Sequence, residues 1–496
     1  MPPRGKQAQQ ALGDVGDLEG RVVEGTHEHR VGLGNAGHLA DELAGRRLDL
    51  LAGRRGFEAT ELSDVSAHTV IVDAVIRGTS RGRTNNMRSS DVVIVGGGIG
   101  GSALATALAR DGLDVVVLEA TAEYEDRVRG ESMHPWGVRE ARELGVEQTL
   151  LDAGAHVAPA WNHYDADVPA EVTEANPIPV SIMVPDVAGS MNLRHPAACN
   201  ALNAAAVAAG AEVHRGIADV ELTPGASPRV RCNDADGRPT EFTTRIVVGA
   251  DGRNSTVRRQ TGIPLCREEE TSMIAGLLVE DLEGVSDERD FLASQDDLFM
   301  AAFHQGGGRA RIYLCPGLAQ KYRFSGPKGL DEFRRSARFG CLPFGEALAD
   351  AKPAGPLATY PGDDSWTEQP FTEGVVLVGD AAGFNNPIIG EGLSITMRDA
   401  RTVRDVLRTH DWSPVAFAPY AEERMERMRR LRQAAMFMSA TFANECDNRP
   451  QRRARFFDMM QNEPLLLGMM MGVMGGPEVA PPEAFDGRLL AAMQAG

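Results

Sequence analysis

Three glycines and one acidic residue have the types and spacing to hold a phosphate and a ribose. Gly96, Gly98 and Gly101 form the pattern G-x-G-x-x-G, and Glu119 follows 18 residues after Gly101. In such a turn the glycines permit a tight bend, close approach of the backbone to a pyrophosphate, and close packing of a helix on a strand. The acid binds ribose hydroxyls. The pattern predicts an adenine dinucleotide, NAD or FAD; a glycine-rich turn in an unrelated α/β unit is the alternative.

Two later apolar runs also end in polar turns. The first runs into Gly-Ala-Asp-Gly with Asp251, and the second into Gly-Asp with Asp380. Each places a carboxylate at a strand end, although the first, taken alone, is equally an ordinary tight turn. The glycine-rich residues 390–393 open a long expected helix, and the free N–H groups of its first turn attract partial negative charge.

Two arginines are candidates for contact with a phosphate or a cofactor ring. Arg129 lies in a glycine-bearing loop after the second expected strand, and Arg194 directly precedes a helix that begins near Pro196. Arginine forms charge-assisted, bidentate hydrogen bonds to phosphate. A solvated surface arginine is the alternative at both positions.

The elements that must position these residues read as an α/β fold. Residues 92–95 and 115–118 are apolar and β-branched, as in buried parallel strands, with a helix expected over 102–110. Strands expected at 157–164 and 177–184 interrupt this pattern. We therefore predict a Rossmann-like nucleotide-binding domain, an interrupting β-sheet substrate domain and a helical C-terminal segment.

The expected boundaries follow from these interruptions. The nucleotide-binding domain is discontinuous and covers 89–156, 186–261 and 361–411. The substrate domain covers 157–185 and 262–360, and the helical C-terminal region covers 412–496. Residues 1–88 contain a single aromatic residue and bury too little apolar surface to fold. They are either a disordered extension or upstream sequence included by a misassigned start, with Met87 as the true start.

Composition excludes several classes of function. A net charge of −19 disfavours a nucleic-acid surface. The six cysteines are scattered without a C-x-x-C pair, which favours a reducing compartment over disulfides or zinc. No apolar run is long enough for an integral membrane segment, and no signal peptide precedes the fold. We expect a cytoplasmic protein that is a monomer or a homodimer.

The C-terminal region is rich in arginine and methionine. The arginines of residues 424–432 are expected to form a solvated helix face, and the methionines of residues 459–474 to form adaptable packing. The alternative is a pliable apolar lid over a bulky substrate.

The three turns, taken in this order along the chain, carry a family resemblance. The chain resembles the single-component, group A FAD-dependent aromatic hydroxylases, the family of para-hydroxybenzoate hydroxylase, over about residues 91–410. The resemblance implies that the dinucleotide is FAD and that NADPH or NADH is a co-substrate. Two positions depart from the family pattern: Gly383 stands where many members have histidine, and Glu391 replaces the glutamine of a frequent Gly-Gln-Gly.

The resemblance also implies roles for individual residues. The glycine turn and Glu119 would hold the ADP half of FAD, flanked by Arg129 and Arg194. Asp251 would lie in a motif shared by FAD and the transient nicotinamide nucleotide, and Asp380 would bind the ribitol and pyrophosphate side. The residues expected at the flavin ring are Pro387, Gly392 and Leu393.

The implied reaction is monooxygenation. NAD(P)H would reduce FAD, O2 would form a flavin C4a-hydroperoxide, and its distal oxygen would hydroxylate or epoxidise an electron-rich small molecule, aromatic or polyketide-like. No catalytic base is identified by the sequence. Four side chains on expected substrate-domain strands could polarise a phenol, or could simply be packed or surface residues: His163, Tyr164, His304 and Tyr313.

Three alternatives remain at this point. A flavin-dependent halogenase would need a lysine facing a tunnel from the flavin, and no lysine occurs between Asp91 and Lys321. A prenyl or C=C reductase of the same superfamily would consume no oxygen. A non-catalytic flavoprotein would bind FAD without turning over NADPH.

Overall fold

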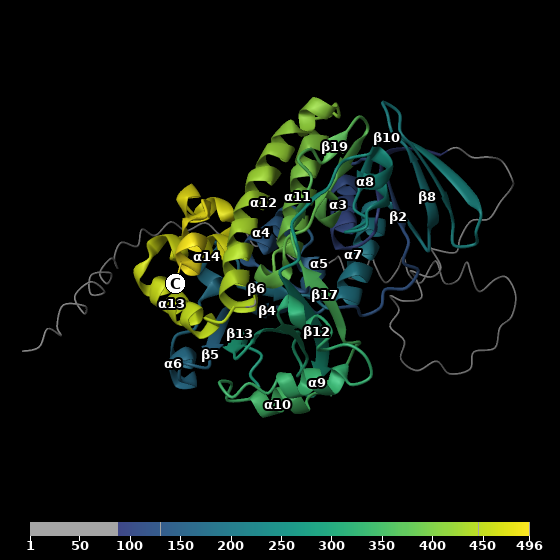
Figure 1. Ribbon diagram of the computed structural model, residues 1–496. Coiled ribbons are helices and arrows are strands. Elements are labelled where there is room, and N and C mark those ends of the chain that lie inside the picture. Colours follow the sequence, from purple (N-terminus) through teal and green to yellow (C-terminus); the bar gives the residue numbers. More distant parts are fainter. Residues whose placement is uncertain (1–87, 129, 445, 496) are drawn as a thin grey trace, which may run out of the picture. The chain divides into compact units, whose positions relative to one another are not determined.

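The computed structural model describes residues 88–128, 130–444 and 446–495. All of these residues belong to one unit defined by its internal contacts, Ala74–Gly496. The expectations for residues 1–87 lie outside the described residues, and Figure 1 shows how the described elements are arranged.

A mainly parallel sheet carries the glycine turn. Its strand order is β19-β20-β10-β1-β2-β7, and β8 and β9 continue it as an antiparallel ribbon from β10. β1 lies between β2 and β10 and is parallel to both, with Val92 opposite Val115 and Ile246. The strands are β1 (Arg88–Val95), β2 (Val115–Glu119), β7 (Glu212–Arg215), β8 (Ala218–Thr223), β9 (Arg229–Asn233), β10 (Pro239–Gly249), β19 (Phe371–Thr372) and β20 (Val375–Leu377).

Both faces of β1 are buried, which explains its continuous apolar sequence. Val92 and Ile94 pack into one apolar core, against helices α3 (Ile99–Arg110), α7 (His195–Ala209) and α11 (Gly392–Arg408). Val93 and Val95 pack into another, against α8 (Thr256–Thr261) and β9. Because β1, β10 and β20 are parallel neighbours, their carboxyl ends meet at one edge of the sheet.

A second, mostly antiparallel sheet has the order β16-β12-β15-β14-β13-β5, with β17 also paired to β12. One of its faces packs on α9 (Gly329–Ser336) and α10 (Gly345–Asp350), which lie at the bottom of Figure 1. The other face joins the same apolar core as Val92 and Ile94. The strands are β5 (Ala160–Asp165), β12 (Ser272–Glu280), β13 (Arg289–Gln295), β14 (Leu298–His304), β15 (Ala310–Cys315), β16 (Lys352–Pro353) and β17 (Ala358–Gly362).

Short elements connect the two sheets. The order β3-β6-β4 forms a small antiparallel sheet, and β11 pairs with β18. These elements are β3 (Ser132–Met133), β4 (His156–Ala158), β6 (Ser190–Asn192), β11 (Cys266–Arg267), β18 (Ser365–Trp366), α4 (Pro135–Glu143), α5 (Glu147–Asp152), α6 (Ala170–Ala175), η1 (Val180–Ile182), η2 (Leu318–Gln320), η3 (Gly379–Ala382) and η4 (Pro387–Ile389).

The C-terminal region is helical, as predicted, and α12 lies beside α11 (Figure 1). α12 passes into a π-helical turn at its C-terminal end, and the chain then folds back in the yellow helices on the left of the figure. The elements are η5 (Pro414–Phe417), α12 (Ala418–Met438), η6 (Ser439–Ala443), α13 (Arg449–Asn462), α14 (Pro464–Gly475), η7 (Pro477–Val479), η8 (Pro482–Phe485) and α15 (Arg488–Gln494).

Two predicted strands were wrong in detail, and proline explains both. Residues 157–164 form two strands, β4 and β5, which are separated at Pro159. Residues 177–184 form no strand: Ile178 makes one isolated bridge to Trp161, and a 3₁₀ turn follows. Proline has no N–H to donate to a sheet, so Pro177 and Pro179 limit pairing there.

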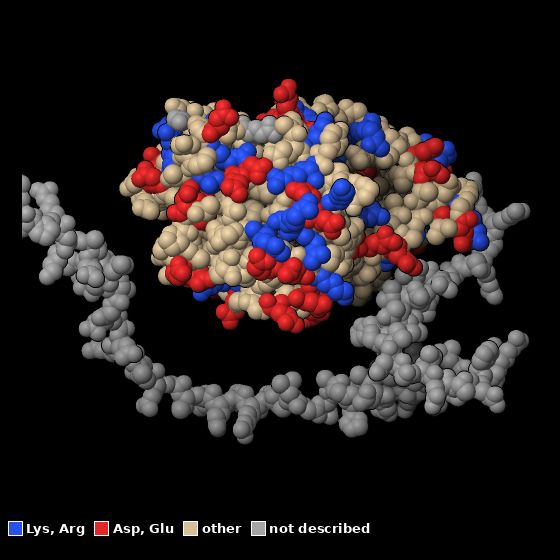
Figure 2. All heavy atoms as spheres, turned by 60° about the horizontal axis from the view of Figure 1, so that its bottom comes forward, with Lys and Arg blue, Asp and Glu red and all other residues tan. Residues whose placement is uncertain are grey.

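Charged side chains of both signs cover the face shown in Figure 2. Lys and Arg side chains gather near the middle of this face, with Asp and Glu side chains beside them and uncharged residues over much of the rest. Within the described residues, none of the helices combines the length and apolar character needed to cross a membrane. The six cysteines, all of them in the described part of the chain, form no disulfide.

Candidate functional site

The three glycines of the first turn have three different surroundings. Gly96 has a φ of +105°, and a Cβ there would lie 2.3 Å from the carbonyl oxygen of Ala250. A Cβ on Gly101 would lie 1.9 Å from the carbonyl oxygen of Gly96. A Cβ on Gly98 would meet no protein atom within 4 Å. Gly96 and Gly101 are therefore required for folding of the turn, whereas Gly98 leaves open space in which a pyrophosphate fits.

Glu119 is held at the edge of this turn. Its carboxylate accepts hydrogen bonds from the backbone N–H groups of Gly97 (2.6 Å) and Thr121 (2.7 Å), and the residue is buried. A carboxylate fixed beside the open space at Gly98 fits the binding of ribose hydroxyls.

A clamp that sequence reasoning missed fixes the same turn. The carbonyl oxygen of Gly97 accepts hydrogen bonds from Tyr124 Oη (2.6 Å), Ser102 Oγ (2.7 Å) and Asn203 Nδ2 (2.8 Å). Burial is the largest cause that raises the pKa of Tyr124, so its hydroxyl stays protonated and can donate. Asn203 belongs to α7, far along the chain, and no local pattern indicates this contact.

Asp251 closes the second turn. One carboxylate oxygen accepts from Ser255 Oγ (2.6 Å), and the other accepts from the N–H groups of Thr256 (2.6 Å) and Val257 (3.1 Å). These bonds satisfy the first N–H groups of α8. In this structure the carboxylate thus caps a helix, and a role toward FAD or a nicotinamide nucleotide stays a prediction.

Asp380 lies at the third turn with about a third of its side chain exposed. Arg253 Nε lies 3.4 Å from its carboxylate, and the Arg253 guanidinium stacks 4.3 Å from the ring centre of Phe384. Arg258, on α8, donates to the carbonyl oxygen of Ala381 (2.8 Å) and so ties the second turn to the third. The carboxylate of Asp380 is accessible to a ligand at the sheet edge.

The arginines of α12 correct the expectation of a solvated face. Arg424 and Arg427 are buried, and both pair with the buried Asp399 of α11 at 2.9 and 2.7 Å. Arg424 also donates to carbonyl oxygens of the third turn, including that of Gly383 (2.8 Å). Asp399 accepts from the N–H of Gly379 (2.9 Å). The C-terminal helix therefore holds the turn that carries Asp380.

The N-terminus of α11 is open at its first residue. A Cβ on Gly392 would meet nothing within 4 Å, and this first residue of the helix is exposed. Burial raises the pKa of the adjacent Glu391 well above its ordinary value, with Trp136 and Ser394 beside its carboxyl. A raised pKa favours the neutral form of this carboxyl, whose shape is close to that of the glutamine in Gly-Gln-Gly.

Pro387 begins the 3₁₀ turn η4, which contacts the second sheet through a histidine that sequence reasoning missed. His134 Nε2 donates to the carbonyl oxygen of Ile389 (2.8 Å), and its ring centre lies 5.3 Å from that of Trp161 on β5. Burial is the main cause that lowers the pKa of His134 to about 4, so the ring is neutral and its buried Nδ1 is an acceptor without a partner.

Alternation along the strands separates the four candidates for polarising a substrate. His163 and Tyr313 lie on the sheet face that joins the core of the nucleotide-binding sheet, as do Trp161 and Phe303. Tyr164 and His304 lie on the opposite face, near Phe291, where α9 and α10 pack. The structure thus separates the four into two pairs.

The surroundings of each candidate are well defined. His163 is enclosed by Phe299, Phe442, Phe456 and Phe457, with ring centres 5.2–6.2 Å away. Tyr313 hydrogen-bonds to Glu131, whose carboxylate also pairs with the buried Arg311 at 2.6 Å. His304 Nδ1 lies 3.5 Å from Asp290, and burial raises the pKa of Tyr164 to about 12.

Of the two arginines expected beside the cofactor, Arg194 and Arg129, the structure describes only Arg194. Arg194 lies at the start of α7 and donates to the carbonyl oxygen of Gln305 (2.8 Å), while its buried Nε has no partner. It therefore joins the start of α7 to the loop between β14 and β15. Arg129 lies outside the described residues.

Comparison with known proteins agrees with this geometry. A family model described as "FAD binding domain" matches residues 89–434. The chain is 26% identical to squalene monooxygenase of Rattus norvegicus over 338 residues, which cover 66% of this chain and 56% of that protein. It is 28% identical to rifampicin monooxygenase of Streptomyces venezuelae over 341 residues, 62% of each chain. The chain spans less than two thirds of the length of these curated relatives.

Solved structures show the same fold. The p-nitrophenol 4-monooxygenase of Pseudomonas putida superposes with a TM-score of 0.64 at 19% identity, covering 79% of this chain and 98% of that one. The protein PqsL of P. aeruginosa, solved with 2-aminobenzoylacetate, gives 0.61 at 23% identity, covering 75% and 100%. A flavin-dependent halogenase gives 0.63 at 19% identity, covering 77% and 73%.

Proposed function

Because the chain belongs to the FAD binding domain family, we propose that it is an FAD-dependent monooxygenase. In this proposal it uses NADPH or NADH and O2 to hydroxylate or epoxidise an electron-rich small molecule, aromatic or polyketide-like. The similarity to a squalene monooxygenase and a rifampicin monooxygenase supports the reaction class.

The observation that carries the proposal is the contact between the two sheets. The turn that begins with Pro387 and the aromatic face of the second sheet meet through His134, which contacts both Ile389 and Trp161. A cofactor ring held near this turn would thus lie close to a buried apolar surface that includes Phe303 and Tyr313. Such a surface suits an apolar substrate and keeps water from the reacting atoms.

The residues of the chain supply binding, orientation and electrostatics. FAD, when bound, supplies electron transfer and the activation of oxygen. The space at Gly98 and the carboxylate of Glu119 fit its pyrophosphate and ribose, and Asp380 fits its ribitol side. The N–H groups of Gly392 and Leu393 would stabilise negative charge on the edge of the ring system, as an oxyanion hole does.

The test combines cofactor content with turnover. We expect purified protein to contain one non-covalent FAD per chain, released by mild denaturation, and to oxidise NADPH faster with a true substrate while O2 is consumed. The product should gain one oxygen atom, measured by mass spectrometry, with little peroxide. A protein that takes up no FAD on reconstitution would contradict the proposal.

The same assay separates the alternatives. For a C=C reductase, the substrate would accelerate NADPH oxidation equally with and without oxygen. A non-catalytic flavoprotein would not oxidise NADPH. For a halogenase, the described part of the chain offers only the exposed Lys321, Lys328 and Lys352 as lysines, and none of them lies in the buried region between the sheets.

The proposal extends to location and assembly. A cytoplasmic location fits six cysteines without a disulfide. A monomer or a homodimer is proposed from chain size, and light scattering coupled to size-exclusion chromatography measures it.

A further inference from the structure

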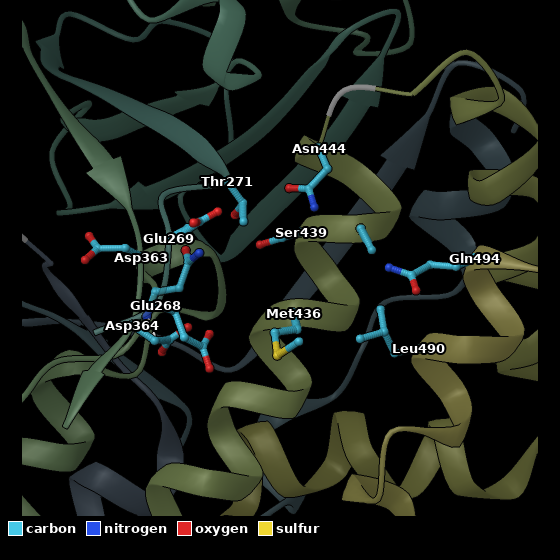
Figure 3. A pocket seen from close by; sticks show the side chains of 12 residues that line it. Glu268, Glu269, Thr271, Asp363, Asp364, Met436, Ser439, Asn444, Leu490 and Gln494 are labelled. Atoms are coloured by element: carbon cyan, nitrogen blue, oxygen red, sulfur yellow. Dashed lines mark hydrogen bonds between the residues drawn. The ribbon is translucent and has the colours of Figure 1, made fainter. Parts of the chain in front are cut away.

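An acidic cleft opens beside the turn that begins with Pro387 (Figure 3). It has a volume of about 210 Å³ and reaches Asn386, the residue directly before Pro387. One wall comes from the segments between β11 and β12 and between β17 and β18. The other wall comes from α12, η6 and α15. Its lining includes four acidic side chains and one serine: Glu268, Glu269, Asp363, Asp364 and Ser439.

The carboxylates that line this cleft outnumber the arginines that pair with them. Asp363 pairs with Arg267, and Glu268 lies 3.8 Å from Arg432. Glu269 and Asp364 have no Lys or Arg within ion-pair distance among the described residues. Asp364 instead accepts hydrogen bonds from the Asn385 side chain and from the N–H of Asn386 (2.9 Å). Burial raises the pKa of Asp364 to about 7, so near neutral pH this carboxyl carries only part of a negative charge. The surplus negative charge of the cleft, next to the expected flavin ring, therefore rests mainly on the exposed Glu269.

A second observation points to a polar ligand. The side chain of Ser439 points into the cleft, toward the wall of Glu269 and Thr271 (Figure 3). Ser439 is 2% exposed, and its Oγ has no hydrogen-bond partner. An unpartnered buried polar atom is costly, so the hydroxyl of Ser439 is best explained by a polar partner that enters the cleft.

We propose that this cleft binds the cationic end of the substrate, a protonated amine carried on an apolar body. An ammonium group donates several hydrogen bonds and is attracted by Glu269 and Asp364. Met436 and Leu490, on the opposite wall, contact its carbon skeleton. The inference rests on the proposed function, which places the reacting flavin near Asn386, and it narrows the substrate class to amines.

A metal ion is a poorer occupant of the same cleft. Among the described residues, no group of three or more His, Cys, Asp or Glu side chains converges as metal ligands do. A dianionic or trianionic nucleotide is repelled by the surplus carboxylates. A single organic cation fits both the charge and the mixed polar and apolar lining.

Calorimetric titration of the FAD-loaded full chain tests the inference with three phenols of similar size. The probes are tyramine, which is cationic, 4-ethylphenol, which is neutral, and 3-(4-hydroxyphenyl)propionate, which is anionic. We expect tyramine to bind about tenfold more tightly than 4-ethylphenol, because its ammonium group forms charge-assisted hydrogen bonds in the cleft. The propionate should bind most weakly.

Three substitutions locate the effect. Glu269→Gln, at an exposed position, and Asp364→Asn should each reduce the preference for tyramine severalfold, and Ser439→Ala should weaken tyramine more than 4-ethylphenol. Glu283→Gln removes the same charge from an exposed site outside the cleft and should leave all three affinities unchanged. Glu269→Gln removes no internal hydrogen bond, so it tests the inference even if another variant misfolds.

Equal binding of tyramine and 4-ethylphenol, or a preference that survives Glu269→Gln and Asp364→Asn together, would overturn the inference. Flavin content and NADPH-driven flavin reduction are measured on the same samples. Turnover with neutral phenols only would refute the amine site and leave the monooxygenase proposal standing. Failure of flavin reduction would refute the monooxygenase proposal, while the titrations would still decide whether the cleft binds a cation.

Discussion

At the scale of single residues, a substitution at Gly98 should weaken cofactor binding without weakening the fold. Its Cβ position is empty and its φ of −67° suits any residue, so Gly98→Ala should leave the stability of the FAD-free protein within about 0.5 kcal/mol. The added methyl group occupies the space that fits a pyrophosphate. We expect FAD affinity to fall at least about tenfold, measured by flavin fluorescence titration.

Gly101→Ala is the matched comparison for this prediction. Its Cβ would overlap the carbonyl oxygen of Gly96, so this variant should lose stability as well as FAD. An unchanged FAD affinity in Gly98→Ala would show that no phosphate lies against this residue.

The buried His163 should make the free energy of unfolding depend on pH. Burial lowers the pKa of His163 from 6.5 to about 4. Between pH 4 and pH 6.5, therefore, this histidine is mostly protonated in the unfolded chain and mostly neutral in the folded chain. The free energy of unfolding therefore falls as the pH falls from about 6.5 to 4. From pH 7 to pH 5 the loss due to this residue is about 2 kcal/mol.

Urea unfolding of His163→Phe at both pH values measures this contribution. Phenylalanine suits the surrounding ring cluster, so the variant should lose less stability on acidification than the parent. His410→Gln, at an exposed position, should behave as the parent does. An equal loss in His163→Phe and in the parent would mean that His163 is protonated in the folded protein.

At the scale of elements, α11 and α12 hold the third turn through one buried carboxylate. Burial by itself would raise the pKa of Asp399, but Arg424 and Arg427 outweigh it and hold the pKa below its usual value. Asp399→Asn leaves the buried Arg424 without an anion, leaves Arg427 with Glu423 alone, and weakens the acceptor of the Gly379 N–H. We expect a loss of about 3–5 kcal/mol of stability together with weaker FAD binding.

Chemical denaturation and FAD titration measure the two effects. Asp486→Asn breaks a solvent-exposed pair with Arg488 and should change neither. If Asp399→Asn kept full FAD affinity despite its lower stability, the turn would be held by other contacts.

At the scale of the whole molecule, the compact unit Ala74–Gly496 contains every residue of the three apolar cores, and the first of these residues is Val92. The family match begins at residue 89. A chain that begins at Met87 should therefore fold and bind FAD with the affinity of the full chain. Circular dichroism and flavin titration measure this, and a truncated chain that fails to fold would assign residues 1–86 a part in the fold.

The sequence by itself determined the nucleotide-binding half of the fold and its first turn. The reason is local: a buried parallel strand needs apolar β-branched residues, and the backbone at Gly96 and Gly101 leaves no room for a side chain. The same local logic placed Asp251 and Asp380 at strand ends. The effect of proline is equally local: Pro177 and Pro179 prevent the strand predicted at residues 177–184.

Only the tertiary structure decided which distant residues serve the site. Asn203 and Tyr124 fix Gly97, Asp399 and Arg424 fix the turn of Asp380, and these contacts join segments that no sequence period relates. Alternation along a strand predicts which side chains share a face, but only the packing of the two sheets shows which face meets the nucleotide-binding core. The acidic cleft is likewise assembled from separate segments, because its charge arises where their ends meet.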